Sequence, residues 1–449
     1  MKRIGEFLGL SLAVIVWVAT MTAASEPVTV KMVYWPGPES DAMQKVVDWY
    51  NENVTPSSGV KVEMVLFGRE GFFEREATLL AAGSSEVDMI FTTSYIIHEH
   101  APYLENLYPY FANPELRGEG TPDILIPTVK ESFVVDGELK GLVMDASINL
   151  LLYRKDLVEQ LLTNPEWREM YRRIAVRELG RELLPKHPED WTWDDFMATA
   201  LFFSKSQNPD SPTTYGTALQ AKAMWPNGKI WSSVLRSCGG SWLDEQGTPA
   251  FNSASARRAM DIYVSLVEKG ATSPACITYE YMEPNEAVRT GEAAMILQWG
   301  VAYIELTDPE RSPLVWDKIG VAPHPAGDVH HTVWLTSMGV GLSKFSQHKE
   351  ESFKWLSFLA TLDAQRMYGQ NGGVPGVTEV LNELSAQKPI YGYVADYLDK
   401  YAFFEVAGAK TVGVLRIIAQ YVSAACALQM NAETALANIQ REVAELLSQ

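Results

Sequence analysis

Three short segments of the sequence are polar and two of them carry aromatic rings, and polar groups and aromatic rings are the two features that a carbohydrate-binding site needs. The three segments run from Trp35 to Asp41, from Gly68 to Glu70 and from Thr92 to Tyr95. A sugar stacks its apolar ring face on an aromatic side chain, and its hydroxyl groups must recover hydrogen bonds when they leave water. Carboxylates and arginine side chains form the strongest of these bonds, and an arginine would also suit a carboxylate or phosphate on the ligand. The candidate binding residues in these segments are Trp35, Glu39, Arg69, Thr93 and Tyr95.

Each segment follows a predicted β-strand near the start of the chain. Alternating or continuous apolar residues predict strands over 28–34, 60–67 and 87–91. Helices are predicted between them, the first after a cap at Ser40 or Asp41 and the second over 72–82. This β-α-β-α-β order predicts a parallel sheet with right-handed crossovers. Because open parallel sheets bind ligands outside the carboxyl ends of their strands, we expect the three segments to lie together at one edge of the sheet.

The rest of the chain is richer in predicted helix. Thr192 is a plausible cap for one helix, with Asp194 and Asp195 in its first turn. The two aspartates could be taken for catalytic carboxylates, but the helix dipole alone explains acidic residues at a helix start. Periodic stretches predict further helices over 254–269, over 349–368 and from residue 432 to the C-terminus.

Length and charge limit the class of protein. The chain has 449 residues, more than one hydrophobic core usually serves, so two domains are expected. Its formal net charge is −19 at pH 7. Phosphate backbones and anionic lipids would repel such a surface, which argues against nucleic-acid or membrane-surface partners.

The first 24 residues have the pattern of a secretion signal. Lys2 and Arg3 precede a mostly apolar stretch from Phe7 to Ala24, and Thr22 and Ala24 fit a small-residue cleavage site. A retained membrane anchor is the alternative, but the apolar core is short for a span. No later stretch is apolar enough to cross a bilayer, and no cysteine near the signal could carry a lipid. We therefore expect a cleaved, unlipidated protein in the periplasm.

Cys238, Cys276 and Cys426 are too few for a disulfide framework. Export would permit a bridge between Cys238 and Cys276, but buried free thiols are the favoured interpretation.

A series of short segments, in a fixed order along most of the chain, resembles the extracellular solute-binding proteins of family 1, which include sugar receptors of ABC importers. Each segment alone looks like a turn or a cap, and their order is the specific signal. The segments are Leu80 to Gly83 with Val87 to Ile90, Asp136 to Leu142, Leu151 to Leu157, Trp191 to Phe196, Ala250 to Ser253, Gly291 to Met295, Ile319 to Pro323, and Gly372 to Pro375.

The resemblance implies an α/β fold of the periplasmic-binding-protein type, with two α/β lobes, a hinge and a ligand cleft between the lobes. The expected N-terminal lobe covers 25–145 and 336–375, and the expected C-terminal lobe covers 146–335 and 376–449. Crossings between the lobes are expected near 144–147, near 334–338 and near Pro375. The segment 159–188 is longer than the family pattern, which leaves the local shape of the second lobe open.

The resemblance also adds candidate ligand contacts. Asp145 and Asn149 lie near the first crossing and Trp334 lies near the second, while Trp299 matches a family position that stacks on sugar. Trp225 and Trp231 bracket Pro226-Asn227-Gly228 and are further candidates. The alternative for each tryptophan is core packing, and for each polar residue it is a cap or a surface charge.

The function implied is capture of a mono- or oligosaccharide and its delivery to an ABC permease, by a monomer without cofactor, metal or catalytic residue. The same receptor loaded with a polyol, a sugar acid or a phosphorylated polyol is the first alternative. A secreted carbohydrate-active enzyme is the second, although the only nucleophile pattern is Ser346-Gln347-His348-Lys349, which is short enough to arise by chance. A histidine group at His324, His330 and His331 could suggest zinc, but solvated loop histidines are commoner.

Overall fold

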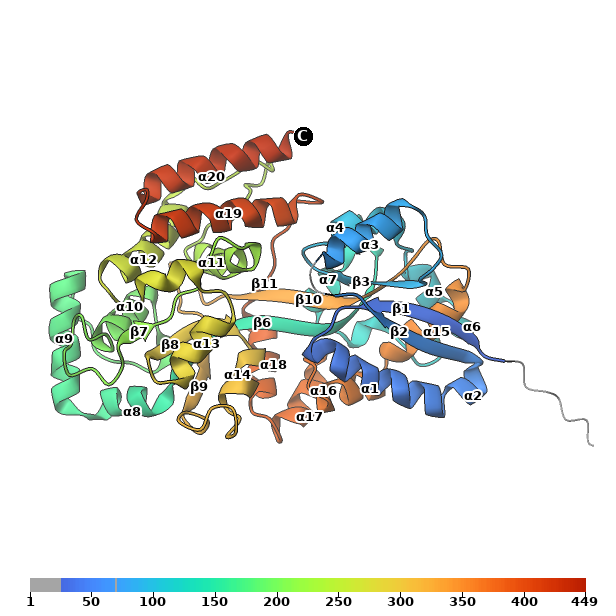
Figure 1. The fold of residues 1–449 in the computed structure, drawn as a ribbon, viewed down its shortest axis with the longest axis horizontal. Helices are drawn as coiled ribbons and strands as arrows, with labels where there is room; N and C mark the ends of the chain where they lie inside the picture. Colours follow the sequence, from blue (N-terminus) through green and yellow to red (C-terminus); the bar gives the residue numbers. More distant parts are fainter. Residues whose placement is uncertain (1–25, 69–70) are drawn as a thin grey trace, which may run out of the picture.

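The computed structural model describes residues 26–68 and 71–449, so the signal segment 1–24 and the candidate Arg69 lie outside the described residues. Two α/β lobes lie side by side and are joined by two long strands (Figure 1). The first lobe contains β1 (Val28–Tyr34), α1 (Pro38–Asn53), α2 (Thr55–Ser58), β2 (Val60–Leu66), α3 (Phe72–Ala81), β3 (Met89–Thr93), α4 (Ile97–His100), α5 (Tyr108–Ala112), α6 (Pro114–Arg117), α7 (Pro127–Glu131), β4 (Val134–Val135), β5 (Glu138–Leu139), α15 (Lys349–Leu359) and α16 (Leu362–Gln370).

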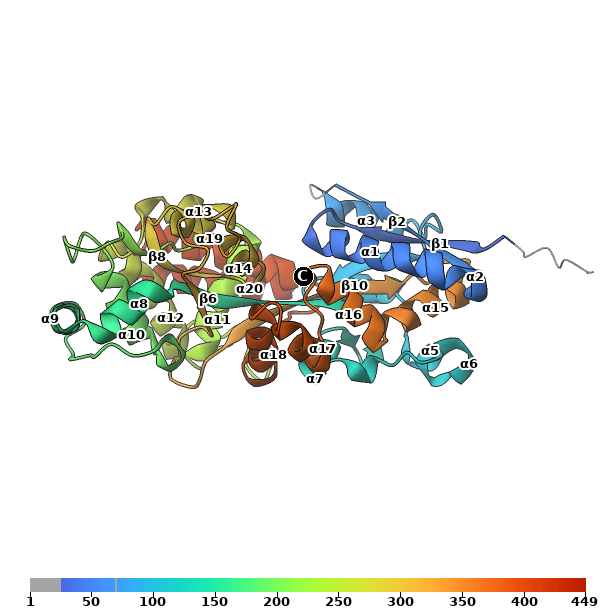
Figure 2. The same cartoon turned by 90° about the horizontal axis from the view of Figure 1, so that it is seen from below.

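The second lobe is larger and mostly helical. It contains α8 (Lys155–Thr163), α9 (Pro165–Leu179), α10 (Trp193–Phe202), β7 (Tyr215–Thr217), α11 (Trp225–Ser237), α12 (Ala254–Glu268), α13 (Met282–Arg289), β8 (Ala293–Trp299), α14 (Val301–Leu306), β9 (Ile319–Ala322), β11 (Ala402–Phe403), α19 (Thr411–Cys426) and α20 (Ala432–Leu447). Helices α17 (Thr378–Ser385) and α18 (Ile390–Lys400) lie under the junction of the lobes, where α17 contacts α16 and α18 contacts β9 (Figure 2).

The first three strands confirm the predicted parallel arrangement. β1 pairs in parallel with β2 from Val28↔Val60 to Tyr34↔Leu66, and with β3 at Met32↔Met89. Apolar side chains from the buried faces of β1 and β3 pack against Met43 and its neighbours on α1. The β-α-β-α-β order therefore produced the expected sheet edge, with the ends of β1 and β3 adjacent.

Two boundaries at this edge differ from the sequence prediction. Helix α1 begins at Pro38 rather than after Ser40, because proline fits the first position of a helix, where its missing N–H leaves no bond unmade. Glu39 consequently lies in the first helical turn. Strand β3 continues to Thr93, so Thr92 and Thr93 are buried ladder residues opposite β10, and the loop begins only at Ser94.

The strands β6 (Leu142–Arg154) and β10 (Val333–Leu342) connect the lobes. They pair antiparallel with each other, and β10 then pairs with β3 of the first lobe, while β6 pairs with β8 and β9 of the second. The full sheet order is β2-β1-β3-β10-β6-β8-β7. The register between β6 and β10 shifts between Met338 and Gly339, an irregularity of the β-bulge type. Both lobes thus share strands rather than a flexible linker.

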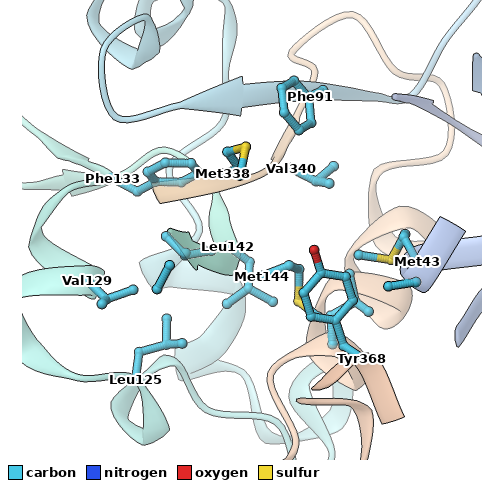
Figure 3. Packing of buried hydrophobic residues seen from close by; sticks show 14 of the residues in the cluster. Met43, Phe91, Leu125, Val129, Phe133, Leu142, Met144, Met338, Val340 and Tyr368 are labelled. Atoms are coloured by element: carbon cyan, nitrogen blue, oxygen red, sulfur yellow. The ribbon is translucent and has the colours of Figure 1, made fainter. Parts of the chain in front are cut away.

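The buried apolar side chains form two clusters. The first core includes Met144, Val340 and Tyr368, which lie close together beside the junction (Figure 3). The second core lies around α10, α11, α12 and α19 and contains Trp193, Trp231 and Trp334. The first cluster also includes Ala293, Ile296 and Val321 of the second lobe, so the packing continues across the junction.

The predicted caps and helices are largely present in the second lobe and at the C-terminus. Thr192 accepts a hydrogen bond from the Asp195 backbone, and the Asp195 side chain accepts one from the Thr192 backbone. Asp194 pairs with Arg181 and Arg258. These contacts confirm the structural interpretation of the two aspartates over the catalytic one. The predicted helix over 349–368 is instead two helices, because Thr361 caps α16 after a break at Ala360.

The three cysteines are buried free thiols, as favoured from the sequence.

In the part of the chain that the structure describes, no helix combines the length and apolar character needed to cross a membrane.

Candidate functional site

An aromatic surface forms where β1 and β3 of the first lobe end. Trp35 follows β1, and its ring lies 4.8 Å from Phe91 and 5.9 Å from Phe73, measured between centroids. Phe73 in turn lies 5.9 Å from Tyr95. The rings therefore form a continuous series from the end of β1 to the loop after β3. Phe73 was not predicted from the sequence, because a phenylalanine on an amphipathic helix is indistinguishable there from a core residue.

Tyr95 joins this series to the second lobe. Its ring lies 4.7 Å from Trp225, the first residue of α11. Trp299 stands at the end of β8, where it pairs with Asn149 of β6. Trp35, Tyr95, Trp225 and Trp299 were proposed separately from the sequence. The structure brings these four residues to the place where the two lobes meet.

A lysine that the sequence did not single out lies among these rings. Lys229 is one helical turn after Trp225, and its Nζ is 3.8 Å from the ring centroid of Tyr95, 4.8 Å from that of Trp225 and 5.3 Å from that of Trp299. It donates a hydrogen bond to Thr336 Oγ1 on β10 at 3.1 Å. Burial lowers the pKa of Lys229 well below its usual range. Both lobes and the connecting strand therefore contribute to one buried cluster.

The hinge carboxylate Asp145 is held by the third connecting segment. Its Oδ2 accepts hydrogen bonds from Tyr368 Oη at 3.0 Å and from Val374 N at 2.9 Å. The Val374 carbonyl accepts in return from the Ala146 backbone, and Met338 of β10 pairs with Asp145. The three segments that were expected to cross between the lobes therefore meet at this residue.

The pKa of Asp145 is raised to about 7, because burial penalises its charge and the Glu39 carboxylate repels it. Burial also raises the pKa of Tyr281 in the second lobe, with smaller contributions from Glu305 and Glu39. Glu39 thus influences Asp145 and also Tyr281 of the second lobe, so the first turn of α1 lies near the meeting of the lobes.

Asn149 has a structural partner and a spare donor. Its Oδ1 accepts from the Trp334 backbone at 2.9 Å and from Ser233 Oγ at 3.3 Å. Its Nδ2 has no hydrogen-bond partner among the described residues. An unpaired donor in a buried position calls for an explanation, and a hydroxyl group of a ligand is one that we carry forward as a prediction.

Three predicted site residues lie inside the fold. Trp231 is fully buried, six positions after Trp225, on the side of α11 that faces the second core. Trp334 is 1% exposed and stacks on Trp242 with centroids 5.5 Å apart. Thr93 is buried within β3. These positions favour packing for the three residues, and their role as ligand contacts stays a prediction, as does that of Trp35, Glu39, Tyr95, Asp145, Asn149, Trp225 and Trp299.

The patterns that could suggest catalysis have structural partners. Ser346 donates a hydrogen bond to Asp88 at 2.6 Å, and Lys349 pairs with Glu105 at 2.8 Å, so the two do not act on each other. His324 is buried, and its carbonyl contacts Nδ1 of His331 at 2.7 Å. No group of three or more potential metal ligands occurs within residues 26–68 and 71–449.

Comparison with known proteins agrees with this geometry. The family model described as bacterial extracellular solute-binding protein matches residues 36–366. The chain belongs to this family. Members are binding proteins that serve ABC permeases and work in the periplasm or outside the cell.

Individual relatives of this solute-binding protein are distant. A probable amino-acid ABC transporter periplasmic-binding protein of Sinorhizobium fredii is 24% identical over 365 residues, which cover 77% of this chain and 75% of the relative. The structure of maltose-bound MalE3 of T. maritima has a TM-score of 0.74 at 23% identity, covering 93% of this chain and all of that one. A solute-binding protein of Agrobacterium vitis S4 with bound D-mannitol has a TM-score of 0.70 at 22% identity, covering 94% and 98%. These structures show the same two-lobed fold.

The raised pKa of Asp145 predicts a pH dependence of stability. In the unfolded chain the carboxyl titrates near pH 4, so between about pH 4 and 7 the folded protein holds a proton that the unfolded chain has lost. The contribution of Asp145 to the free energy of unfolding is therefore greatest at low pH and decreases as the pH rises to about 7. Asp145→Asn keeps an acceptor for Tyr368 and Val374 but removes this decrease.

Denaturant unfolding of the ligand-free protein at pH 5 and pH 8 measures this effect. The stability of Asp145→Asn relative to the wild type should be higher at pH 8 than at pH 5, whereas the exposed substitution Asp123→Asn should show little change between the two. A pH-independent difference for Asp145→Asn would contradict the prediction.

Proposed function

We propose that this solute-binding protein captures a sugar in the cleft between its lobes and delivers it unchanged to an ABC permease. The observation that carries the proposal is the contact of Tyr95 of the first lobe with Trp225 of the second, with Trp299 on the far side of Lys229 and the unpaired amide donor of Asn149 opposite Trp299 in the sheet. Flat rings bind the apolar faces of a sugar, and the polar groups bind its hydroxyls.

The lobes give the mechanism of capture. A ligand that contacts both Tyr95 on one lobe and Trp225 or Trp299 on the other binds the closed arrangement better than an open one, and so shifts the population towards closure. The motion would occur in β6, β10 and the segment at Val374. The lobe boundaries proposed from the sequence, 25–145 with 336–375 and 146–335 with 376–449, agree with a hinge at Asp145. The permease would then recognise the closed form.

Sugars suit this cleft better than the other ligands suggested by relatives. The MalE3 structure holds maltose and the Agrobacterium vitis structure holds D-mannitol, whereas the Sinorhizobium fredii relative is named for amino acids. Several large rings at one site match the extended apolar faces of pyranoses, whereas most amino acids lack such a face. A polyol remains the nearest alternative. We propose further that the mature protein is a periplasmic, unlipidated monomer without cofactor or nucleic-acid partner.

A hydrolytic function is the competing proposal, because Glu39 and Asp145 are two carboxylates at one cleft. A glycosidase needs both of them, one as the general acid and the other as the nucleophile or base. Asp145 instead uses Oδ2 to accept two hydrogen bonds that hold the hinge. We therefore propose that the protein is not an enzyme.

A ligand screen tests the proposal. The purified mature protein would be exposed to mono- and oligosaccharides and polyols, with the unfolding temperature and the tryptophan fluorescence as readouts. We expect a saturable rise in unfolding temperature with at least one sugar, a fluorescence change from Trp225 and Trp299, and recovery of the sugar intact. Amino acids serve as the comparison class. Release of a hydrolysis product, or a response to amino acids alone, would overturn the proposal.

A further inference from the structure

Lys229 is an unusual residue to find in the centre of a neutral sugar site. It is 3% exposed, and its side chain extends from α11 towards the meeting point of the lobes, where Tyr95, Trp225 and Thr336 surround the ammonium group. Lysine is almost never fully buried without a counter-charge. Burial favours the neutral amine, so the ammonium form persists only where the structure or a ligand stabilises it.

The protein itself compensates the charge only in part. The ammonium has three donor positions, and within the described residues one hydrogen bond is made, to the neutral hydroxyl of Thr336. The rings of Tyr95, Trp225 and Trp299 attract the cation through their electron-rich faces. No carboxylate in the described part of the chain opposes the effect of burial on the Lys229 pKa. Two donor positions and the charge remain for another partner.

The cleft is therefore polarised. Glu39 acts on Asp145 and Tyr281, and both carboxylates lie on the side of the hinge, where they suit hydroxyl donors. Neither contributes to the pKa of Lys229, which is affected by burial alone. Closure of the cleft removes water from the cation, so a ligand that brings a negative group to Lys229 restores the interactions lost with water, whereas a neutral hydroxyl restores them less fully.

We propose that Lys229 binds an anionic group of the ligand, a carboxylate or a phosphate, so that the receptor takes sugar acids or sugar phosphates in preference to neutral sugars. This inference rests on the proposed function of the same cleft. The aromatic rings that surround the ammonium hold the sugar face, and Lys229 then selects among sugars by charge.

Matched pairs of ligands test the inference in the wild-type protein. Calorimetric titration would compare D-galacturonate with D-galactose, D-gluconate with D-glucitol, and D-glucose 6-phosphate with D-glucose. A charge-assisted hydrogen bond to a buried ammonium predicts that the acidic member of at least one pair binds about 10- to 100-fold more tightly than its neutral partner. Whether a carboxylate or a phosphate is preferred follows from which pair responds.

Substitutions assign the preference to the residue. Lys229→Met has a similar length without charge and should reduce the acid preference to less than about threefold, while Lys229→Arg should retain part of it. The matched control is Lys222→Met, an exposed lysine just before α11, which should leave the preference unchanged. Since Lys229→Met removes a buried charge, its unfolding temperature without ligand should be equal to or higher than that of the wild type.

The outcomes separate the two proposals. Neutral sugars that bind the wild type as tightly as their acids would overturn the role of Lys229 and leave the sugar receptor intact. Absence of binding by every sugar, acidic or neutral, would overturn the proposed function itself. An acid preference that survives in Lys229→Met would assign the anion to another residue. If Lys229→Met does not fold, the wild-type pairs decide.

Discussion

Replacing Trp299 with alanine is expected to weaken ligand binding by about 30-fold or more, which corresponds to a loss of about 2 kcal/mol or more, as for a central aromatic contact in a binding site. Trp299 lies at the end of β8, opposite Asn149, and its ring centroid is 5.3 Å from Lys229 Nζ. Part of its side chain remains exposed. Its indole can therefore stack on a sugar without being needed to complete the core. The dissociation constant from calorimetric titration measures the effect, with the unfolding temperature determined in parallel.

Trp316→Ala is the control for this experiment. Trp316 is 45% exposed, in the segment between α14 and β9, and its removal should change neither affinity nor stability appreciably. If Trp299→Ala binds the ligand as tightly as the wild type, Trp299 does not contact the ligand. If both variants lose affinity equally, the loss is not specific to the cleft.

Replacing Trp334 with alanine is expected to cost about 3–5 kcal/mol of unfolding free energy, the range found for large aromatic residues removed from a core. Trp334 is 1% exposed, stacks on Trp242 and meets Phe403 edge-on with centroids 5.3 Å apart. The cavity left by the indole would be lined by these rings and could not collapse easily. Equilibrium denaturation of the ligand-free protein measures the loss.

A milder substitution separates packing from ligand contact at this position. Trp334→Phe leaves much of the core filled, so it should lower stability less than Trp334→Ala and leave the dissociation constant of the ligand nearly unchanged. A large loss of affinity in Trp334→Phe with normal stability would instead restore Trp334 to the binding site.

The early part of the fold could be predicted because its signals are local. The strands and helices from Val28 to Thr93 each repeat apolar residues with the period of their structure, and a β-α-β-α-β order admits few arrangements. The cap at Thr192 is equally local, since it depends on residues three positions apart. The exact end of β3 was missed, because the pairing with β10 that extends it to Thr93 involves residues far away in the sequence.

Helix α11 shows why other parts could not be predicted. Its first turn contains Pro226 and Gly228, residues that usually mark a break. Proline is acceptable in the first turn of a helix, and a Cβ on Gly228 would lie 2.8 Å from the carbonyl oxygen of Leu415, so the glycine allows α11 and α19 to approach closely. Neither cause is visible in the sequence. The helical spacing that places Trp225 and Lys229 on one face and Trp231 on the other was missed with it.

The candidate site was predictable by residue type and less so by arrangement. Trp35, Tyr95 and Trp299 were proposed because aromatic residues follow strand ends or match a family position, and the structure brings them to the junction of the lobes. Lys229 gave no signal, since most lysines are exposed and its burial depends on Tyr95 and Trp299, which come from distant segments, as well as on the neighbouring Trp225. The role of each of these residues in binding stays a prediction until a ligand is measured.

The irregular pairing at Met338 and Gly339 has a consequence for how such receptors diversify. A Cβ at position 339 would lie 2.0 Å from the carbonyl oxygen of Leu142 on the neighbouring strand, so only glycine fits where the connecting strands change register. The loops that carry Trp35 and Tyr95 and the first turn of α11 that carries Trp225 meet no such restriction from this point. The proposed ligand-selecting residues can therefore change one by one, while the register shift at Gly339 between the connecting strands remains the same.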